Sequence, residues 1–147
     1  MNTYKGRFIP LHPKKYKGDP TGIVYRSLWE RQLFRWLDSQ TFVESWSSEE
    51  TVVPYRCKTD NKLHRYFVDV KMTFTDGRTF LIEVKPAKET EPPKSKGRQG
   101  KRFITEVLTY AKNISKWEAA QSYAADRGWI FEIWTEDTLR KLGIKII

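Results

Sequence analysis

The spacing of apolar residues predicts two long helical segments. Between Tyr25 and Leu37 they recur every three or four positions and form one stripe, which is the pattern of an amphipathic helix. The same period runs along a second segment, at Phe103, Val107, Tyr110, Ala111, Ile114, Trp117, Ala120 and Ala124. Within it, Ser115-Lys116-Trp117-Glu118 has the form of a capping box, so we expect a break near Asn113 and a new helix beyond it. Gly128 marks the C-terminal end of this helical region.

Strict alternation of apolar and polar residues predicts a hairpin between the two helical segments. The alternation runs without interruption from Arg65 to Phe74. Asp76-Gly77 is a turn signal, and Thr79 to Lys85 has the pattern of the second strand.

Shorter elements complete the predicted fold. Thr51 to Tyr55 is predicted as a short strand, with Pro54 favouring a sheet edge or a strand end. Trp129 to Thr135 has the pattern of a strand, and Glu136 to Leu142 that of a short helix that Gly143 ends. The order of helix, strand, hairpin, helix, strand and helix indicates a mixed α/β domain with a central sheet.

Length and composition fit one folded domain. The chain has 147 residues and no internal repeat, and its 14% aromatic content is too high for a disordered polycation. A single cysteine, Cys57, excludes an internal disulfide and fits a reducing compartment. No apolar run is long enough to span a membrane, so we expect no membrane association. The net charge of +9 favours a polyanionic partner, most often nucleic acid.

The positive charge is concentrated in two segments rich in Pro and Gly. Residues 1–26 hold six Lys and Arg against one Asp, and residues 85–102 hold seven against two Glu, so each segment carries +5. Both compositions are typical of extended or flexible chain. We therefore expect a single domain, 1–147, with a basic N-terminal arm (about 1–24) and a basic linker (about 86–102).

Such charged segments are either solubilising tails or arms that grip phosphates. On the second interpretation the DNA-binding candidates are Lys14, Lys15, Lys17, Arg26, Lys94, Lys96, Arg98, Lys101 and Arg102. Arg26 and Ser27 have an alternative role in capping the first helix. Lys112 and Lys116 are expected on the exposed face of their helix, with contact to phosphate as the alternative.

The hairpin turn decides whether two carboxylates meet. A two-residue loop would pair residue 75 with 78 and leave Asp69 and Glu83 on opposite faces. A three-residue loop with Gly77 in a left-handed conformation pairs 74 with 78. Asp69 then faces Glu83 directly, and Lys85 follows on the same face. We predict the second arrangement.

Two opposed carboxylates repel each other unless a cation lies between them or one holds a proton. A hard divalent ion such as Mg²⁺ takes oxygen ligands of this kind, and Mn²⁺ is expected to substitute for it. Lys85 would add an ammonium group beside a bound phosphate. This combination suits metal-assisted hydrolysis of a phosphodiester. Glu30 lies at the border of its apolar stripe, either as a further acidic member of the site or as a solvated residue paired with Arg26.

The succession Glu30, Asp69 and Glu83-Val84-Lys85 resembles the motif of the PD-(D/E)xK nuclease superfamily, with Val68 where the motif has proline. The resemblance implies a restriction-endonuclease-like α/β core, a central mixed sheet flanked by helices. It implies Glu30, Asp69, Glu83 and Lys85 as catalytic residues. The implied metal ligands are Asp69, Glu83, the backbone carbonyl of Val84, and Glu30.

Longer stretches resemble the head-completion nucleases of T-even-like tailed bacteriophages. They are 14–20, 25–27 with 29–30, 65–67, 89–93 and 117–122. This resemblance implies a Mg²⁺-dependent DNA endonuclease that acts around DNA packaging, before neck and tail attach. It implies DNA as substrate, phage head, portal or neck proteins as partners, and the cytoplasm of the infected host or the virion as location. Folds of this kind often pair to cut both strands, which leaves a homodimer open.

Two other functions remain open from the sequence. The chain could be a DNA-binding structural protein of the head or neck that kept the fold without the chemistry. It could also be an endonuclease of the junction-resolvase or transposase type with a different biological role. Metal-dependent cleavage of DNA separates the first alternative from an enzyme.

Overall fold

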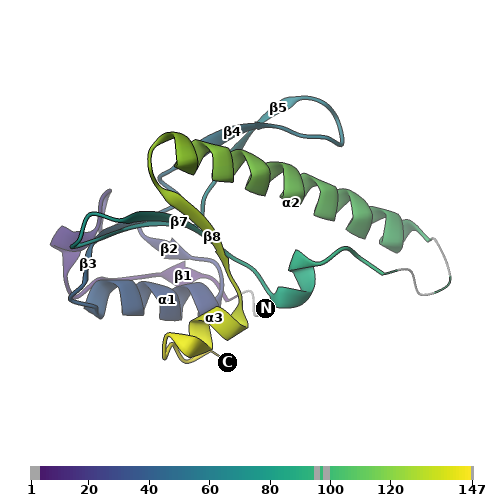
Figure 1. Cartoon of the computed structure of the whole chain (residues 1–147). Coiled ribbons are helices and arrows are strands. Elements are labelled where there is room, and N and C mark those ends of the chain that lie inside the picture. Colours follow the sequence, from purple (N-terminus) through teal and green to yellow (C-terminus); the bar gives the residue numbers. More distant parts are fainter. Residues whose placement is uncertain (1–3, 95–96, 98–99, 147) are drawn as a thin grey trace.

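The structure is a computed structural model that describes residues 4–94, 97 and 100–146 (Figure 1). Its central sheet has the strand order β3-β6-β7-β8, with β7 and β8 parallel and the other pairs antiparallel. These strands are β3 (Val43–Ser48), β6 (Val70–Phe74), β7 (Thr79–Val84) and β8 (Ile130–Trp134). The sheet is thus mixed, as expected from the sequence.

Helices lie on both faces of this sheet (Figure 1). They are α1 (Leu28–Ser39), α2 (Lys101–Asp126) and the short α3 (Glu136–Lys141). The buried side of α1 packs with Trp46, Met72 and Ile82 in one apolar core. Leu81, on the opposite face of the sheet, packs with Trp117 of α2 in a second core. Within the described residues, no helix is long and apolar enough to cross a membrane.

A separate two-stranded ribbon lies beside α2 (Figure 1). It consists of β4 (Val52–Arg56) and β5 (Leu63–Phe67), which pair antiparallel. Pro54 is in an edge position, as predicted, because β4 has a partner on one side alone. The inward residues of the ribbon, among them Tyr55 and Tyr66, contribute to the second core.

The basic N-terminal segment is extended, but it is packed onto the domain. Its strand β1 (Gly6–Arg7) pairs with β2 (Val24–Tyr25), and Pro13–Lys15 forms the short 3₁₀ helix η1. Phe8 and Tyr16 are buried in the core beside Trp46. We call residues 4–25 the N-terminal strap.

Three local predictions are corrected by the structure. The strand predicted from Arg65 to Phe74 is interrupted at Val68 and Asp69, so that β5 and β6 belong to different sheets. The predicted break near Asn113 is absent, because the Ser115 hydroxyl donates to the Ala111 carbonyl and accepts from the Lys58 N–H instead of capping a helix. The basic segment predicted as an extended linker, about 86–102, is not extended throughout, because Ala87–Thr90 forms the 3₁₀ helix η2 and Lys101 and Arg102 begin α2. In addition, strand β3 and the pair β1–β2 were not predicted.

Other elements agree with the sequence. Helix α1 begins after the Ser27 cap, whose side chain accepts from the Glu30 N–H. Gly128 follows the end of α2 with φ of 73°, and the Trp129 N–H closes the last turn on Ala124. Helix α3 ends before Gly143.

The turn between β6 and β7 has the predicted three-residue form. The Phe74 N–H donates to Arg78, and Gly77 has φ of 92°. Val70 therefore pairs with Ile82, and Met72 with Phe80. One step beyond this ladder, Asp69 lies opposite Glu83.

We predict that Gly77→Ala destabilises the fold by about 1–2 kcal/mol, the cost of a positive φ for a residue with a Cβ. No atom lies within 4 Å of the added methyl group, so the cost is conformational rather than steric. The free energy of unfolding in urea measures it. Gly22→Ala is the control, because Gly22 lies outside the positive-φ region and its added Cβ meets the movable side chain of exposed Asp19. Equal stability of the two variants would contradict the prediction.

Candidate active site

Asp69 is positioned by the bend that separates β5 from β6. Its carbonyl accepts from the Glu49 N–H at 3.2 Å, which ties the bend to the end of β3. Its side chain is half-buried, and Oδ2 accepts from the Val84 N–H at 2.8 Å. The hydrogen bond spans the β6–β7 pair and aims the carboxylate at the C-terminal end of β7.

Glu83 is the next-to-last residue of β7, and its side chain lies on the face of the sheet that α2 covers. The residue is buried, at 8% exposure. The Tyr66 hydroxyl donates to Oε1, and the Lys85 ammonium lies 3.6 Å from Oε2. Lys85 follows the strand directly and is held there by its N–H, which donates to the Trp134 carbonyl of β8. The predicted convergence of Asp69, Glu83 and Lys85 is therefore found.

The electrostatics of this group are unfavourable to two free carboxylates. Burial raises the pKa of Asp69 well above its ordinary value, and the charges of Glu83 and Glu30 raise it further. The hydrogen bond from Val84 and the charge of Lys85 oppose this shift without cancelling it. Folding has thus placed acidic groups where the negative charge has too little compensation from the protein itself.

Glu30 lies in the first turn of α1 and is 7% exposed, so it is not a solvated helix residue. Its Oε1 accepts from the backbone N–H of Arg26 at 2.6 Å. Burial raises the pKa of Glu30, with additional contributions from Glu49 and Glu83. Glu30 is electrostatically coupled to the other two carboxylates while it lies on the α1 side of the sheet.

Two residues of the site were not predicted from the sequence. Tyr66 comes from β5, and burial and the charge of Glu83 raise the pKa of its hydroxyl, which stays a proton donor. Lys116 comes from α2, where its ammonium lies 5.5 Å from the centre of the Tyr66 ring. Burial lowers the pKa of Lys116, the Lys112 charge lowers it further, and Glu83 and Asp69 oppose this.

We expected both Lys112 and Lys116 to be exposed. Lys112 is exposed, but Lys116 is half-buried. The sequence carries no comparable signal for Lys116, because the burial of its neighbours Ser115 and Trp117 is known from the structure alone. Tyr66 had a clearer signal. It is a hydroxyl on the apolar face of an alternating strand, and such a buried hydroxyl needs a partner.

The predicted DNA-binding residues are found in different environments. Lys14, Lys17, Lys94, Lys101 and Arg102 are exposed. Arg26 is exposed but forms an ion pair with Glu49 at 3.1 Å. The Lys15 ammonium donates to the carbonyls of Asp38 and Gln40, at 3.0 and 2.8 Å, and so caps the C-terminus of α1. Lys96 and Arg98 lie outside the described residues.

The chemistry of these side chains fits a hard divalent cation. Asp69 and Glu83 offer carboxylate oxygens, the ligands that Mg²⁺ and Mn²⁺ take in proteins. The raised pKa of Asp69 shows that its negative charge is not fully compensated, and a bound cation would compensate it. Within the part of the chain that the structure describes, no three acidic, His or Cys side chains are already arranged as a metal-binding group. These carboxylates are therefore suitable ligands for a divalent cation. In the structure, Glu83 accepts a hydrogen bond from Tyr66 and forms an ion pair with Lys85.

Two comparisons with known proteins bear on this site. The family described as TnsA-like endonuclease N terminal matches residues 40–136, a range that includes Asp69, Glu83, Lys85 and Lys116. The chain is also similar to the head completion nuclease of Enterobacteria phage T4, with 46% identity over 146 residues, which are 97% of this chain and 97% of that protein.

We predict that Asp69→Asn stabilises the metal-free protein at neutral pH, raising Tm by roughly 2–4 °C. Between the ordinary pKa of an aspartate and the raised pKa of folded Asp69, the folded state binds more protons than the unfolded state. Stability therefore falls as pH rises through this window. The amide of the variant keeps an acceptor for the Val84 N–H and carries no charge.

Thermal unfolding of both proteins in chelator, at several pH values, measures this effect. The wild type should lose stability with rising pH more steeply than Asp69→Asn, which retains the contribution of Glu30. A lower Tm for the variant at neutral pH, or parallel pH profiles of Tm for the two proteins, would show that the Asp69 carboxylate does not destabilise the folded protein.

Tyr66→Phe is expected to weaken metal binding roughly tenfold or more, the usual loss when a ligand loses the hydrogen-bond partner that orients it. Calorimetric titration with Mn²⁺ provides the measurement. Tyr55→Phe is the matched control, because Tyr55 is buried in the same core and its ring stacks on His64 instead of contacting Glu83. Wild-type affinity in Tyr66→Phe would contradict the role of the hydroxyl.

Proposed function

Since the chain belongs to the TnsA-like endonuclease family and is a nuclease, we propose that it is a Mg²⁺-dependent endodeoxyribonuclease that acts in completing a phage head. The observation that carries the proposal is the convergence of Asp69, Glu83 and Lys85 at the end of β7. The name of the phage T4 relative supports the biological role. In this role the protein would act in the infected host while heads are assembled, around DNA packaging.

Asp69 and Glu83 would hold the cation, with the Val84 carbonyl and Glu30 as further ligands. A bound divalent cation polarises a phosphoryl oxygen and lowers the pKa of a coordinated water. The Val84 N–H keeps Asp69 turned toward the end of β7, and the Tyr66 hydroxyl keeps one oxygen of Glu83 in place. The other oxygen of Glu83 lies nearer Lys85.

Lys85 would bring its ammonium to the scissile phosphate. Its position next to Glu83 places a flexible donor beside both the carboxylates and any phosphate bound there. There the ammonium would stabilise the negative charge that grows on the phosphoryl oxygens in the transition state. Lys116, whose ammonium lies 5.5 Å from the centre of the Tyr66 ring, would add a second cation that interacts with Glu83 and Asp69.

DNA would approach along exposed basic residues near this site. The segment between β7 and α2 begins directly after Lys85; Lys94 of this segment and Lys101 and Arg102 at the start of α2 are exposed. Arg26 and the exposed lysines of the strap, Lys14 and Lys17, are further candidates for contacts to phosphate. Phosphate contacts of this kind position the duplex without reading its sequence.

The proposal is tested by incubating plasmid and branched DNA with the purified protein, in Mg²⁺ and in chelator. We expect cleavage in Mg²⁺ alone, and a loss of about a hundredfold or more in Asp69→Ala and Lys85→Ala. Lys71→Ala is the control. Lys71 lies on the same strand face two residues after Asp69, and its ammonium contacts the Trp129 ring.

Each result has a distinct meaning for the function. Cleavage that persists in chelator, or that is equal in Asp69→Ala, Lys85→Ala and Lys71→Ala, would exclude this site as the catalytic centre. Binding of DNA without cleavage in any metal would favour a structural head or neck protein.

A further inference from the structure

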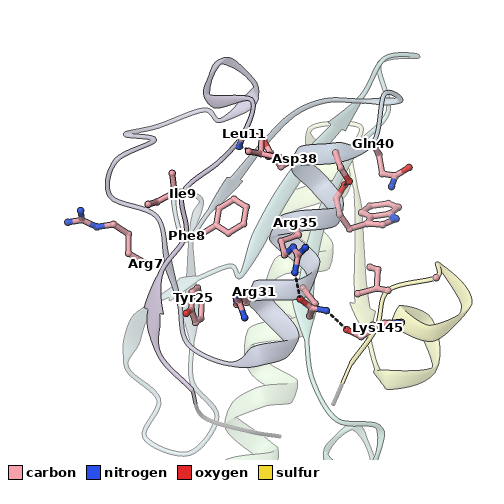
Figure 2. A pocket seen from close by; sticks show the side chains of 15 residues that line it. Arg7, Phe8, Ile9, Leu11, Tyr25, Arg31, Arg35, Asp38, Gln40 and Lys145 are labelled. Atoms are coloured by element: carbon pink, nitrogen blue, oxygen red, sulfur yellow. Dashed lines mark hydrogen bonds between the residues drawn. The ribbon is translucent and has the colours of Figure 1, made fainter.

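A groove on the outer side of α1 shares no lining residue with the carboxylate site. It lies between the N-terminal strap, α1 and the segment that follows α3, and has a volume of about 750 Å³ (Figure 2). Glu83 lies on the face of the sheet that α2 covers, whereas α1 covers the other face (Figure 1). The groove is thus on the opposite side of the sheet from Asp69, Glu83 and Lys85, and Glu30 of α1, although it is on the groove's side of the sheet, is not among the lining residues.

The groove is strongly basic. Arg31 and Arg35 come from α1 and Lys145 from the C-terminal segment, while Arg7 of the strap lines the rim with its guanidinium turned away from the other three (Figure 2). Within the described residues none of these four side chains forms an ion pair. Arg31, Arg35 and Lys145, which form no ion pair in the described part of the chain, favour an anionic ligand.

Among the described residues that line the groove, the one acidic side chain, Asp38, is engaged by the backbone of the strap. Asp38 is buried, and its two carboxylate oxygens accept from the N–H groups of Leu11 and His12 at 2.7 and 3.1 Å. This carboxylate fastens the strap to the C-terminal end of α1. The strap side of the groove is therefore anchored, and the cations of α1 still face solvent.

The same groove exposes large aliphatic side chains. Phe8 of the strap points into the core, and the alternation of the extended chain turns Ile9 and Leu11 outward, where they are 80% and 83% exposed. Half-buried Tyr25 and Trp36 add aromatic surface to the lining. Exposed apolar side chains beside unpaired arginines are typical of surfaces that bind other proteins.

We propose that this groove binds an acidic segment of another protein, one that combines Asp or Glu with large apolar side chains. The arginines would pair with the carboxylates, and Ile9 and Leu11 would be covered by the apolar residues of the partner. A DNA backbone would satisfy the cations and leave the aliphatic side chains in water. The combination of charge and apolar surface therefore favours a polypeptide over a nucleic acid.

Selection from a displayed library of random twelve-residue peptides tests this proposal, with duplex DNA present as a competitor. The wild-type protein is compared with two variants, Arg31→Glu/Arg35→Glu and Ile9→Ser/Leu11→Ser. Lys62→Glu/Arg127→Glu is the matched control. It makes the same charge change at exposed residues of the β4–β5 loop and the end of α2, on the other side of the sheet.

The wild type and the control should enrich acidic peptides that carry apolar residues. A synthetic peptide from that selection should bind roughly tenfold or more weakly to each groove variant, by fluorescence anisotropy. Circular dichroism and nuclease activity of all the variants should equal those of the wild type, which separates a failure of this proposal from a failure of the proposed function.

The remaining outcomes overturn the proposal. Enriched peptides without acidic residues, no enrichment at all, or equal affinity for the groove variants and the control would exclude an acidic peptide site. Weaker binding of duplex DNA by Arg31→Glu/Arg35→Glu would assign the groove to nucleic acid instead.

Discussion

The register of the β6–β7 hairpin is the constraint on which the candidate site depends. A loop of three residues, made possible by the positive φ of Gly77, puts Asp69 opposite Glu83. A loop one residue shorter would turn every side chain of one strand to the other face. The Val84 N–H could then no longer reach Asp69, and Lys85 would leave the carboxylates. A turn remote from the chemistry thus determines whether the chemistry can exist.

This register has an energetic consequence, because it brings together acidic groups that the protein does not fully neutralise. The surrounding donors are the Val84 N–H, the Tyr66 hydroxyl and the Lys85 ammonium. They orient the carboxylates, while burial still raises the pKa of Asp69. Uncompensated charge of this kind costs stability and provides affinity for a cation, which is the usual conflict between stability and function.

The sequence predicted correctly those features that depend on residues close together in the chain. It failed where contacts between distant segments determine the structure. The turn at Gly77 and the end of α2 at Gly128 follow from backbone geometry and were predicted. The bend at Asp69 is invisible in the sequence, because alternation of burial continues through it while the hydrogen-bond partners change from β4 to β3 and β7. Tyr66 and Lys116 reach the site from a separate ribbon and a distant helix, so their roles required the tertiary structure.

Basic residues that lie close together in the sequence have different roles in the folded protein. Lys15 caps α1 through two carbonyls, so part of the charge of the N-terminal segment is structural. Arg7 of the same segment instead lies at the rim of the groove lined by Arg31, Arg35 and Lys145, residues far apart in sequence that no count of local charge would group. The protein therefore has basic surfaces on both sides of its sheet. Asp69, Glu83 and Lys85 lie on the α2 side, so the groove residues Arg31, Arg35 and Lys145 are separate from the carboxylates that would hold the scissile phosphate.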